Sequence, residues 1–216
     1  MKIKICGLRR EEDVAYANEV RPDYVGFILS AGFRRSITRE TARNLKSKLD
    51  PGILAVGVFV DEEPEKITEY LEENVIDVAQ LHGQESEEDI CYIKAVTGKP
   101  VIKTLKMSED PRMNRFMIEA WLDSAADYLL FDSGMGSGKA FDWNLLDELM
   151  QDVGGELPKP FFMAGGLTAD NLREVAGRWR PYAADLSSSV ETDGIKDLEK
   201  MQKAVLAVRE LNDGKE

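Results

Sequence analysis

A cysteine, an arginine and an aspartate each lie at or just beyond the end of an apolar run. Cys6 ends a short run at the N-terminus, Arg35 comes after Tyr24–Leu29, and Asp132 directly follows Tyr128–Phe131. A thiolate is a nucleophile or a base, and a partly desolvated carboxyl group is a general acid. A guanidinium holds a carboxylate with paired hydrogen bonds. If the three runs are parallel strands, these groups meet at one end of the sheet.

Each of these residues also has an ordinary structural interpretation. Cys6 is otherwise a small buried apolar residue, and Asp132 an N-cap or loop-closing aspartate. Arg34 and Arg35 are otherwise solvated charges. A catalytic Cys6 requires a nearby positive group that lowers the pKa of its thiol. Cys91 lies within a helical pattern and is expected to be a buried packing residue.

Two apolar runs in the last third of the chain end in backbone suited to a phosphate. Phe161–Ala164 leads into Gly165-Gly166, and Ala183–Leu186 leads into Ser187–Ser189. Backbone N–H groups at such turns, near the positive end of a helix dipole, favour an anion. Two of these turns on consecutive units are typical of the phosphate site that follows strands 7 and 8 of a (β/α)₈ barrel.

Eight apolar runs alternate with eight helical patterns, which predicts eight βα units. The runs are Ile3–Cys6, Tyr24–Leu29, Ile53–Val60, Val78–Leu81, Val101–Leu105, Tyr128–Phe131, Phe161–Ala164 and Ala183–Leu186. The helical patterns cover about 10–20, 38–49, 64–74, 86–96, 110–124, 142–150, 168–178 and 195–211. Several runs are continuously apolar, as in strands buried on both faces. We therefore expect one (β/α)₈ TIM-barrel domain over residues 1–216, with a doubly wound open sheet as the alternative.

Local signals indicate where several helices begin. Ser86 with Asp89 forms a capping box, and Pro64 suits a first helical turn. Thr168 and Asp142 suit N-caps. The last helical pattern places Ile195, Leu198, Met201, Val205 and Val208 on one face.

Composition limits the class of protein. The 216 residues are 43% hydrophobic and 31% charged, which suits one compact domain. The net charge of −12 argues against nucleic acid as a partner. No run of about 18 apolar residues predicts a membrane span, and Met1–Ile5 does not resemble a secretion signal. Two cysteines make no disulfide framework, so we expect a cytoplasmic protein, with residues 212–216 as a frayed tail.

Two further features lie beside the candidate groups. Ser133–Lys139 is rich in glycine and is interpreted either as a lid over the substrate or as a flexible connection. It lacks the strand-GxxxxGK[ST]-helix spacing of a P-loop. His82 is the single histidine, which excludes a site with several histidine ligands, and the two cysteines offer no zinc spacing. Chemistry without a metal is the expectation.

Taken together, the motifs resemble those of the phosphoribosylanthranilate isomerases of tryptophan biosynthesis, over essentially the whole chain. The matching pieces are Lys4-Ile5-Cys6-Gly7-Leu8, Gly57-Val58-Phe59-Val60, Gln80-Leu81-His82-Gly83, Phe131-Asp132 with Gly136-Ser137-Gly138-Lys139-Ala140-Phe141-Asp142-Trp143, Ala164-Gly165-Gly166-Leu167 and Asp185-Leu186-Ser187-Ser188. Each piece alone is weak evidence, but six in the family's order are specific.

The resemblance implies a (β/α)₈ barrel that performs an Amadori rearrangement without a cofactor. The substrate would be N-(5′-phosphoribosyl)anthranilate and the product 1-(2-carboxyphenylamino)-1-deoxyribulose 5-phosphate. By the same resemblance, Asp132 is the general acid that protonates the ring oxygen of the sugar. Cys6 is the general base that removes the proton from C2′.

The resemblance also assigns the substrate-binding residues. Arg35 would hold the anthranilate carboxylate, and Asp185 would reach a ribose hydroxyl. The main chain around Gly165, Gly166, Ser187 and Ser188 would take the phosphate, while Gln80 and His82 would line the pocket. Two positions depart from the family pattern: Ser36 stands where tyrosine is frequent, and Ser189 where glycine is frequent.

Two alternatives stay open. The same barrel can isomerise another or an additional aminoaldose phosphate, for which a second basic group should face the phosphate cup across the mouth. It can also be a non-catalytic barrel that binds phosphosugars. The expected partner is a small phosphosugar, with neither nucleic acid nor membrane, and the expected assembly is a monomer or homodimer.

Overall fold

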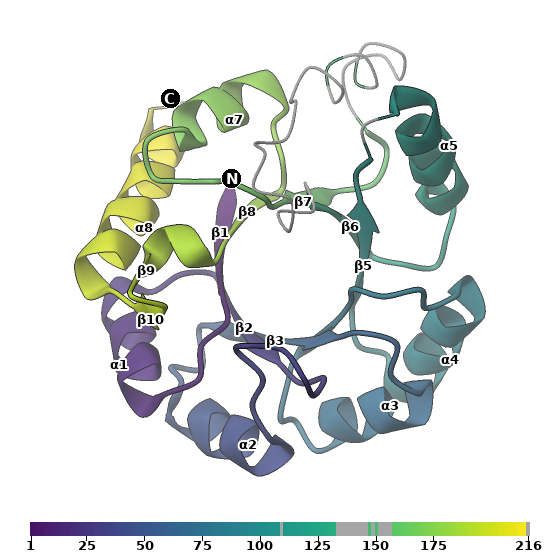
Figure 1. The fold of residues 1–216 in the computed structure, drawn as a ribbon, viewed down its shortest axis with the longest axis horizontal. Coiled ribbons are helices and arrows are strands. Elements are labelled where there is room, and N and C mark those ends of the chain that lie inside the picture. The colour runs from purple at the N-terminus through teal and green to yellow at the C-terminus, as the bar shows by residue number, and fades with distance from the viewer. Residues whose placement is uncertain (109, 133–146, 148–149, 151–156, 215–216) are drawn as a thin grey trace.

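Eight parallel strands form a closed barrel in the computed structural model (Figure 1). The structure describes residues 1–108, 110–132, 147, 150 and 157–214. The strands are β1 Lys2–Cys6, β2 Tyr24–Ile28, β3 Leu54–Phe59, β4 Val78–Leu81, β5 Val101–Lys106, β6 Tyr128–Asp132, β7 Phe161–Met163 and β8 Ala183–Leu186. Their order around the barrel is their order along the chain, and β1 pairs with both β2 and β8. The predicted (β/α)₈ barrel is confirmed, and the open sheet is excluded.

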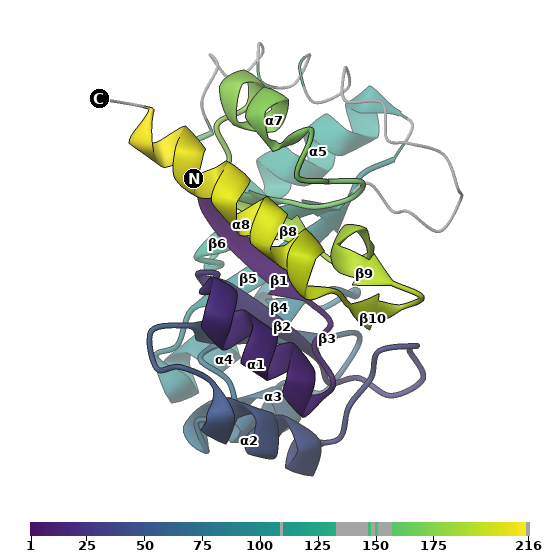
Figure 2. The same cartoon turned by 90° about the vertical axis from the view of Figure 1, so that its left-hand side faces the viewer.

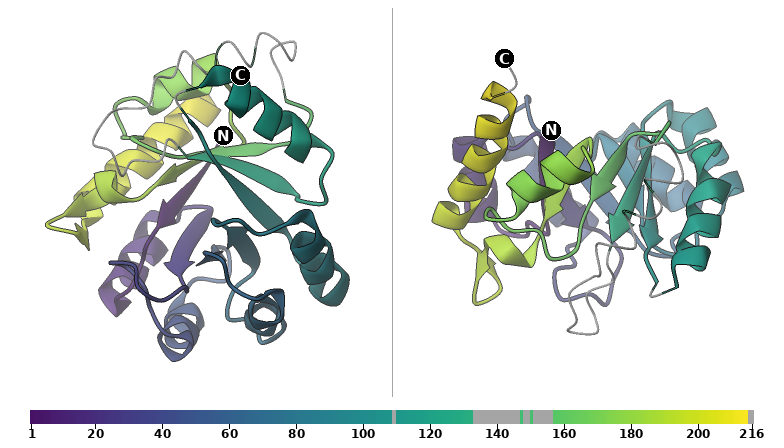
Figure 3. Two further views of the ribbon diagram at one scale, coloured as in Figure 1. Left: turned by 45° about the vertical axis from the view of Figure 1, so that its right-hand side comes forward. Right: turned by 90° about the horizontal axis from the view of Figure 1, so that it is seen from above.

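The helices surround the barrel, as the two views of Figure 3 show. They are α1 Glu11–Val20, α2 Arg39–Lys48, α3 Pro64–Glu72, α4 Glu87–Thr97, α5 Pro111–Leu122, α7 Leu172–Arg178 and α8 Leu198–Asp213. A short 3₁₀ turn, Ser188–Val190, follows β8, and the hairpin of β9 Glu191–Thr192 and β10 Ile195–Lys196 comes next. This hairpin lies at the end of the barrel opposite the N-terminus (Figure 2). Among the described helices, none has the length and apolarity that crossing a membrane requires.

The helix starts test the local signals. The Ser86–Asp89 capping box is confirmed, since each backbone N–H donates to the other's side chain, at 3.2 and 2.7 Å. Pro64 is the first residue of α3, as predicted. Thr168 as an N-cap is wrong: α7 begins four residues later, because Asn171 binds the Thr168 backbone and closes a turn. Asp142, and most of the helical pattern 142–150, lie outside the described residues.

The last helix differs from its prediction at both ends. Ile195 lies in β10 and not on α8, because the hairpin occupies that segment and Asp197 caps the helix. At the other end α8 extends into the expected tail, as far as Asp213. There the Asn212 side chain accepts a hydrogen bond from the N-terminal ammonium at 2.6 Å. Residues 215–216 lie outside the described part of the chain.

Alternate residues of each strand enter two different cores, which explains the continuously apolar runs. One set packs inside the barrel: Tyr24, Val56, Val78, Ile102, Leu130, Phe162, Ala164 and Ala183. The other set packs against the helices and includes Phe27 and Phe59, both fully buried. Aromatic rings fill the N-terminal end of the barrel, where the hydroxyls of Tyr24 and Tyr182 lie 2.9 Å apart. The polar inward-facing residues therefore gather at the C-terminal end.

Candidate active site

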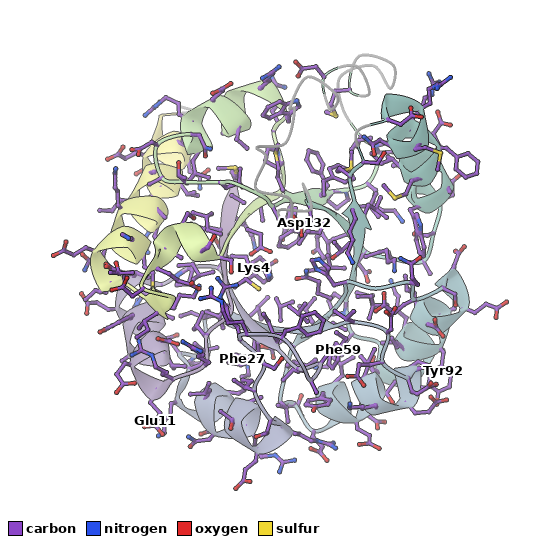
Figure 4. All side chains as sticks on the ribbon, in the orientation of Figure 1. Lys4, Glu11, Phe27, Phe59, Tyr92 and Asp132 are labelled. Carbon is purple, nitrogen blue, oxygen red and sulfur yellow. The ribbon has the colours of Figure 1, made fainter. Side chains whose placement is uncertain are left out.

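A pocket of about 930 Å³ opens at the C-terminal ends of the strands. Every residue that the sequence analysis placed in the site lines it: Cys6, Arg35, Gln80, His82, Asp132, Gly165, Gly166, Asp185, Ser187 and Ser188. Strand register explains the gathering, because residues two apart on a strand face the same side. Gln80 and His82 therefore share the inward face of the fourth unit. Figure 4 shows Lys4 and Asp132 inside the ring of strands.

Cys6 has room in the barrel because its neighbour on β2 is Gly26. A Cβ atom on Gly26 would lie 2.6 Å from the Cys6 Sγ atom and 3.1 Å from its Cα atom. Real Cβ atoms do not approach other heavy atoms this closely, so any larger residue would displace the thiol. The glycine is thus a packing requirement of the cysteine, and the partly exposed thiol reaches the pocket.

A buried ion pair lies directly below Cys6. Lys4 is fully buried on the same face of β1, and its Nζ atom donates to Oδ2 of Asp185 at 2.8 Å. Burial lowers the pKa of Lys4, but the charges and hydrogen bonds of Asp185 and Cys6 together outweigh burial and hold that pKa above its ordinary value. Lys4 is therefore a cation beneath the thiol. Oδ1 of Asp185 is buried and has no hydrogen-bond partner among the described residues.

The thiol of Cys6 has a raised pKa. Burial raises it, the positive charge of Lys4 opposes burial, and the negative charge of Asp185 reinforces it. The expectation of a nearby positive group is met by Lys4, but the expected lowering of the pKa is wrong, because desolvation outweighs the attraction to the cation.

Asp132 lies beside a short hydrogen-bonded chain of polar residues. Nε2 of His82 lies 3.3 Å from Oδ2 of Asp132, and Nε2 of Gln80 lies 3.1 Å from Nδ1 of His82. An amide nitrogen only donates, so Nδ1 of His82 accepts and Nε2 carries the ring proton of a neutral histidine. Gln80 is held in turn by Thr104, whose Oγ1 atom lies 3.3 Å away.

Arg35 lies on the loop between β2 and α2 and makes a two-point ion pair. Its Nε and Nη2 atoms donate to the Glu191 carboxylate at 2.7 and 2.8 Å. Gly7 makes the approach possible: its φ is +86°, and a Cβ atom there would lie 2.5 Å from Cδ of Arg35. Ser36, where the family pattern has tyrosine, donates to the carbonyl of Ser30 at 2.6 Å and braces the loop.

The expected phosphate cup follows β7 and β8. Gly165 and Gly166 have φ values of +86° and +73°, which other residues adopt only with strain. Their N–H groups donate to no acceptor among the described residues. Ser187 and Ser188 line the other side of the cup. Ser189 also lines it, and its buried Oγ atom has no partner among the described residues.

Sequence reasoning missed several charged and aromatic residues around the pocket. Lys4 lies two residues before Cys6 on β1, and Lys106 ends β5, so strand register could have found them. Phe33 follows β2 and lines the mouth, where its side chain is 48% exposed. Glu191 and Lys196 lie on a loop hairpin that no pattern predicted.

Two other expectations can be compared with the structure. Cys91 as a buried residue is wrong: it is exposed on α4, where the buried face consists of Ile90 and Ile93. The glycine-rich segment Ser133–Lys139 lies outside the described residues. Among the residues that are described, no three of His, Cys, Asp or Glu cluster in a way that could hold a metal ion.

Comparisons with known proteins agree with this geometry. Residues 3–207 match the family model described as N-(5'phosphoribosyl)anthranilate (PRA) isomerase. The isomerase of Endomicrobium trichonymphae is 43% identical, with 97% of this chain and 99% of that protein covered. The crystal structure of the Thermus thermophilus isomerase superposes with a TM-score of 0.81 at 35% identity, covering 98% of this chain and all of that one.

A further solved structure has a ligand. It is a phosphoribosyl anthranilate isomerase in complex with reduced 1-(o-carboxyphenylamino)-1-deoxyribulose 5-phosphate, 30% identical with a TM-score of 0.81, and the match covers 97% of this chain and 99% of that one. The family model spans nearly the whole chain, and the relatives match at full length. This chain therefore belongs to the N-(5′-phosphoribosyl)anthranilate isomerase family.

Proposed function

We propose that this protein converts N-(5′-phosphoribosyl)anthranilate into 1-(2-carboxyphenylamino)-1-deoxyribulose 5-phosphate, an Amadori rearrangement in tryptophan biosynthesis. One observation carries the proposal. A thiol on β1 and a carboxyl group on β6 line the same pocket. Its rim carries a guanidinium after β2 and a glycine turn after β7 whose N–H groups have no acceptor among the described residues. An acid, a base, an anion cup and a carboxylate clamp are the four groups that this reaction uses.

Asp132 is the proposed general acid of the first step. It gives its proton to the ring oxygen of the ribose, the bond from that oxygen to C1′ breaks, and the nitrogen lone pair forms an iminium bond to C1′. The His82 imidazole, whose Nε2 atom lies 3.3 Å from the same carboxyl group, stabilises the carboxylate that Asp132 becomes. General acids of this kind contribute about 10²–10⁴-fold in rate.

Cys6 is the proposed general base of the second step. As a thiolate it removes the proton from C2′, and the electrons of that bond form an enolamine between C1′ and C2′. The enolamine then gains a proton at C1′ and loses the one on the 2′-hydroxyl, which leaves the ketone. The buried Lys4 cation favours the thiolate and so opposes the raised pKa of Cys6.

The remaining groups orient the substrate. The N–H groups of Gly165 and Gly166 suit the phosphate, and the unpartnered Oδ1 of Asp185 suits a ribose hydroxyl. Arg35 suits the ring carboxylate, and Phe33 on the same loop offers an aromatic wall beside it. Fixing both ends of the substrate holds C2′ near the thiol, which is how positioning lowers a barrier.

The proposal is tested by following the decay of anthranilate-type fluorescence after the substrate is added to purified protein. Cys6→Ser should lower turnover by at least about 10²-fold. Cys91→Ser is the matched control, because that thiol is exposed on α4 and outside the pocket, and its turnover should equal that of the wild type. A Cys6→Ser enzyme within about threefold of the wild type would exclude the thiol as the base.

The two alternatives give different results in the same experiment. A non-catalytic barrel would bind the reduced product analogue without any turnover. An isomerase with a second aminoaldose phosphate needs another basic group at the mouth, and Lys106 at the end of β5 lines the pocket. That alternative would be supported if the protein turned over a second aminoaldose phosphate and Lys106→Met abolished this turnover but kept the activity on N-(5′-phosphoribosyl)anthranilate.

A further inference from the structure

Glu191 contacts the proposed carboxylate clamp without lining the pocket itself. Its side chain is only 4% exposed on β9, and it is held from two sides. Arg35 donates to both carboxylate oxygens, and Lys196 Nζ donates to Oε1 at 2.8 Å. A carboxylate buried against two cations is fixed in place, since moving it would leave both cations unpaired.

The charge of Glu191 is permanent under the conditions in which an enzyme works. Burial alone would raise its pKa, but the hydrogen bonds and positive charges of Arg35 and Lys196 together outweigh burial and lower the pKa to about 2. The group is therefore a carboxylate at every pH near neutrality, and it holds Arg35 continuously.

The ion pair occupies one edge of the Arg35 guanidinium and leaves the N–H groups at its end without a hydrogen bond to any described residue. Nε and Nη2 of Arg35 face Glu191, and Nη1 makes no hydrogen bond to any described residue. A guanidinium has five N–H donors, so Nη1 and the second hydrogen of Nη2 form a fork at its end. That fork is suited to two parallel hydrogen bonds with a carboxylate. Arg35 lines the pocket, so the fork is available to a ligand there.

We propose that Glu191 is a positioning residue that fixes the guanidinium of Arg35, so that its end fork receives the ring carboxylate of an N-aryl aminoaldose phosphate. This inference rests on the proposed function, because it concerns how that substrate is recognised. Arg34 also contacts Glu191, at 3.1 Å, but its side chain is 60% exposed. An exposed ion pair contributes little, so Arg34 is not part of the device.

The test compares two ligands and two variants. The ligands are the reduced product analogue and the same compound without the ring carboxyl group, and their dissociation constants are measured by calorimetry. In the wild type, the ligand without the carboxyl group should have the larger dissociation constant. Glu191→Gln should reduce the ratio of the two dissociation constants about tenfold and raise KM for the substrate by a similar factor, while kcat stays within about threefold of the wild type. Arg34→Gln removes the exposed third partner of the same carboxylate and should change neither the ratio nor KM by more than about twofold.

A second variant covers the case in which Glu191→Gln does not fold. Glu191→Asp keeps the charge that Lys196 needs but withdraws the carboxylate from Arg35 by about 1.5 Å, one bond length. It too should lower the ratio of the two constants, because the fork is no longer held.

The outcomes separate this role from the proposed function. A wild-type protein that binds neither ligand overturns the proposed function and the role of Glu191 with it. If the wild type distinguishes the two ligands and the folded Glu191 variants distinguish them equally well, only the role of Glu191 is overturned. An Arg34→Gln effect as large as that of Glu191→Gln overturns it as well, since the loss would not be specific to Arg35.

Discussion

Replacing Gly26 by alanine should disable the proposed base although no proposed catalytic residue is substituted. The added Cβ atom would lie 2.6 Å from Sγ of Cys6, 3.1 Å from its Cα and 3.2 Å from its Cβ. Non-bonded atoms are in contact at about 3.5–4.0 Å, so the sulfur must retreat by about 1 Å. Rotating the thiol away relieves only the first contact, and β1 is held by hydrogen bonds to both β2 and β8. The strand itself must therefore shift.

The size of the effect follows from this geometry. Overpacking of this kind costs about 1–3 kcal/mol of unfolding free energy. In a chain of this length that lowers Tm by about 2–4 °C for each kcal/mol. A displacement of about 1 Å in a reacting group costs on the order of 10²-fold in rate, so kcat/KM should fall by about that factor.

Gly177→Ala provides a matched control. Gly177 lies in α7, and a Cβ atom there would meet nothing within 4 Å. Alanine in a helix is favoured over glycine by up to about 1 kcal/mol, so this variant should be slightly more stable and fully active. The two variants are compared by the fluorescence assay and by thermal unfolding. A Gly26→Ala enzyme that keeps kcat/KM within about threefold of the wild type would refute the link between the packing of β1 and catalysis.

Three further changes test the acid, the clamp and the buried carboxylate. Asp132→Asn should lower kcat by about 10²-fold or more yet still bind the reduced product analogue in calorimetry, and near-normal kcat would refute the acid role. Arg35→Ala should raise KM about tenfold or more in steady-state kinetics, so an unchanged KM removes it from the carboxylate site. Because folding lowers the pKa of Glu191 from 4.5 to about 2, its stabilisation is complete above about pH 4.5 and is lost as the pH falls toward 2. In urea unfolding, the stability advantage of the wild type over Glu191→Gln should therefore shrink across that window, and a constant difference would contradict the pairing.

The strands, and the polar residues that end them at the mouth of the barrel, were predictable because they depend on local patterns. A strand inside a (β/α)₈ barrel is buried on both faces, so several runs, such as Tyr128–Phe131, are continuously apolar and stand out from their neighbours. A polar residue that ends such a run, such as Asp132, must lie at the mouth. The start of α7 was not predictable in this way, because Asn171 and Thr168 are both good caps and the turn between them decided which one is used.

The sequence by itself determined the barrel, the order of its strands and many of the residues that meet at the mouth. These follow from periodicities of one strand or one helix and from short motifs that resemble a known family. The tertiary structure decided how deeply those residues are buried and which charged groups they contact. It placed Lys4 and Asp185 beneath Cys6 and raised the pKa of the thiol by burial. It also brought Glu191 into contact with Arg35, although the two residues are 156 positions apart in the sequence. Burial and contacts between distant segments depend on the closed barrel as a whole, so no local pattern contains them.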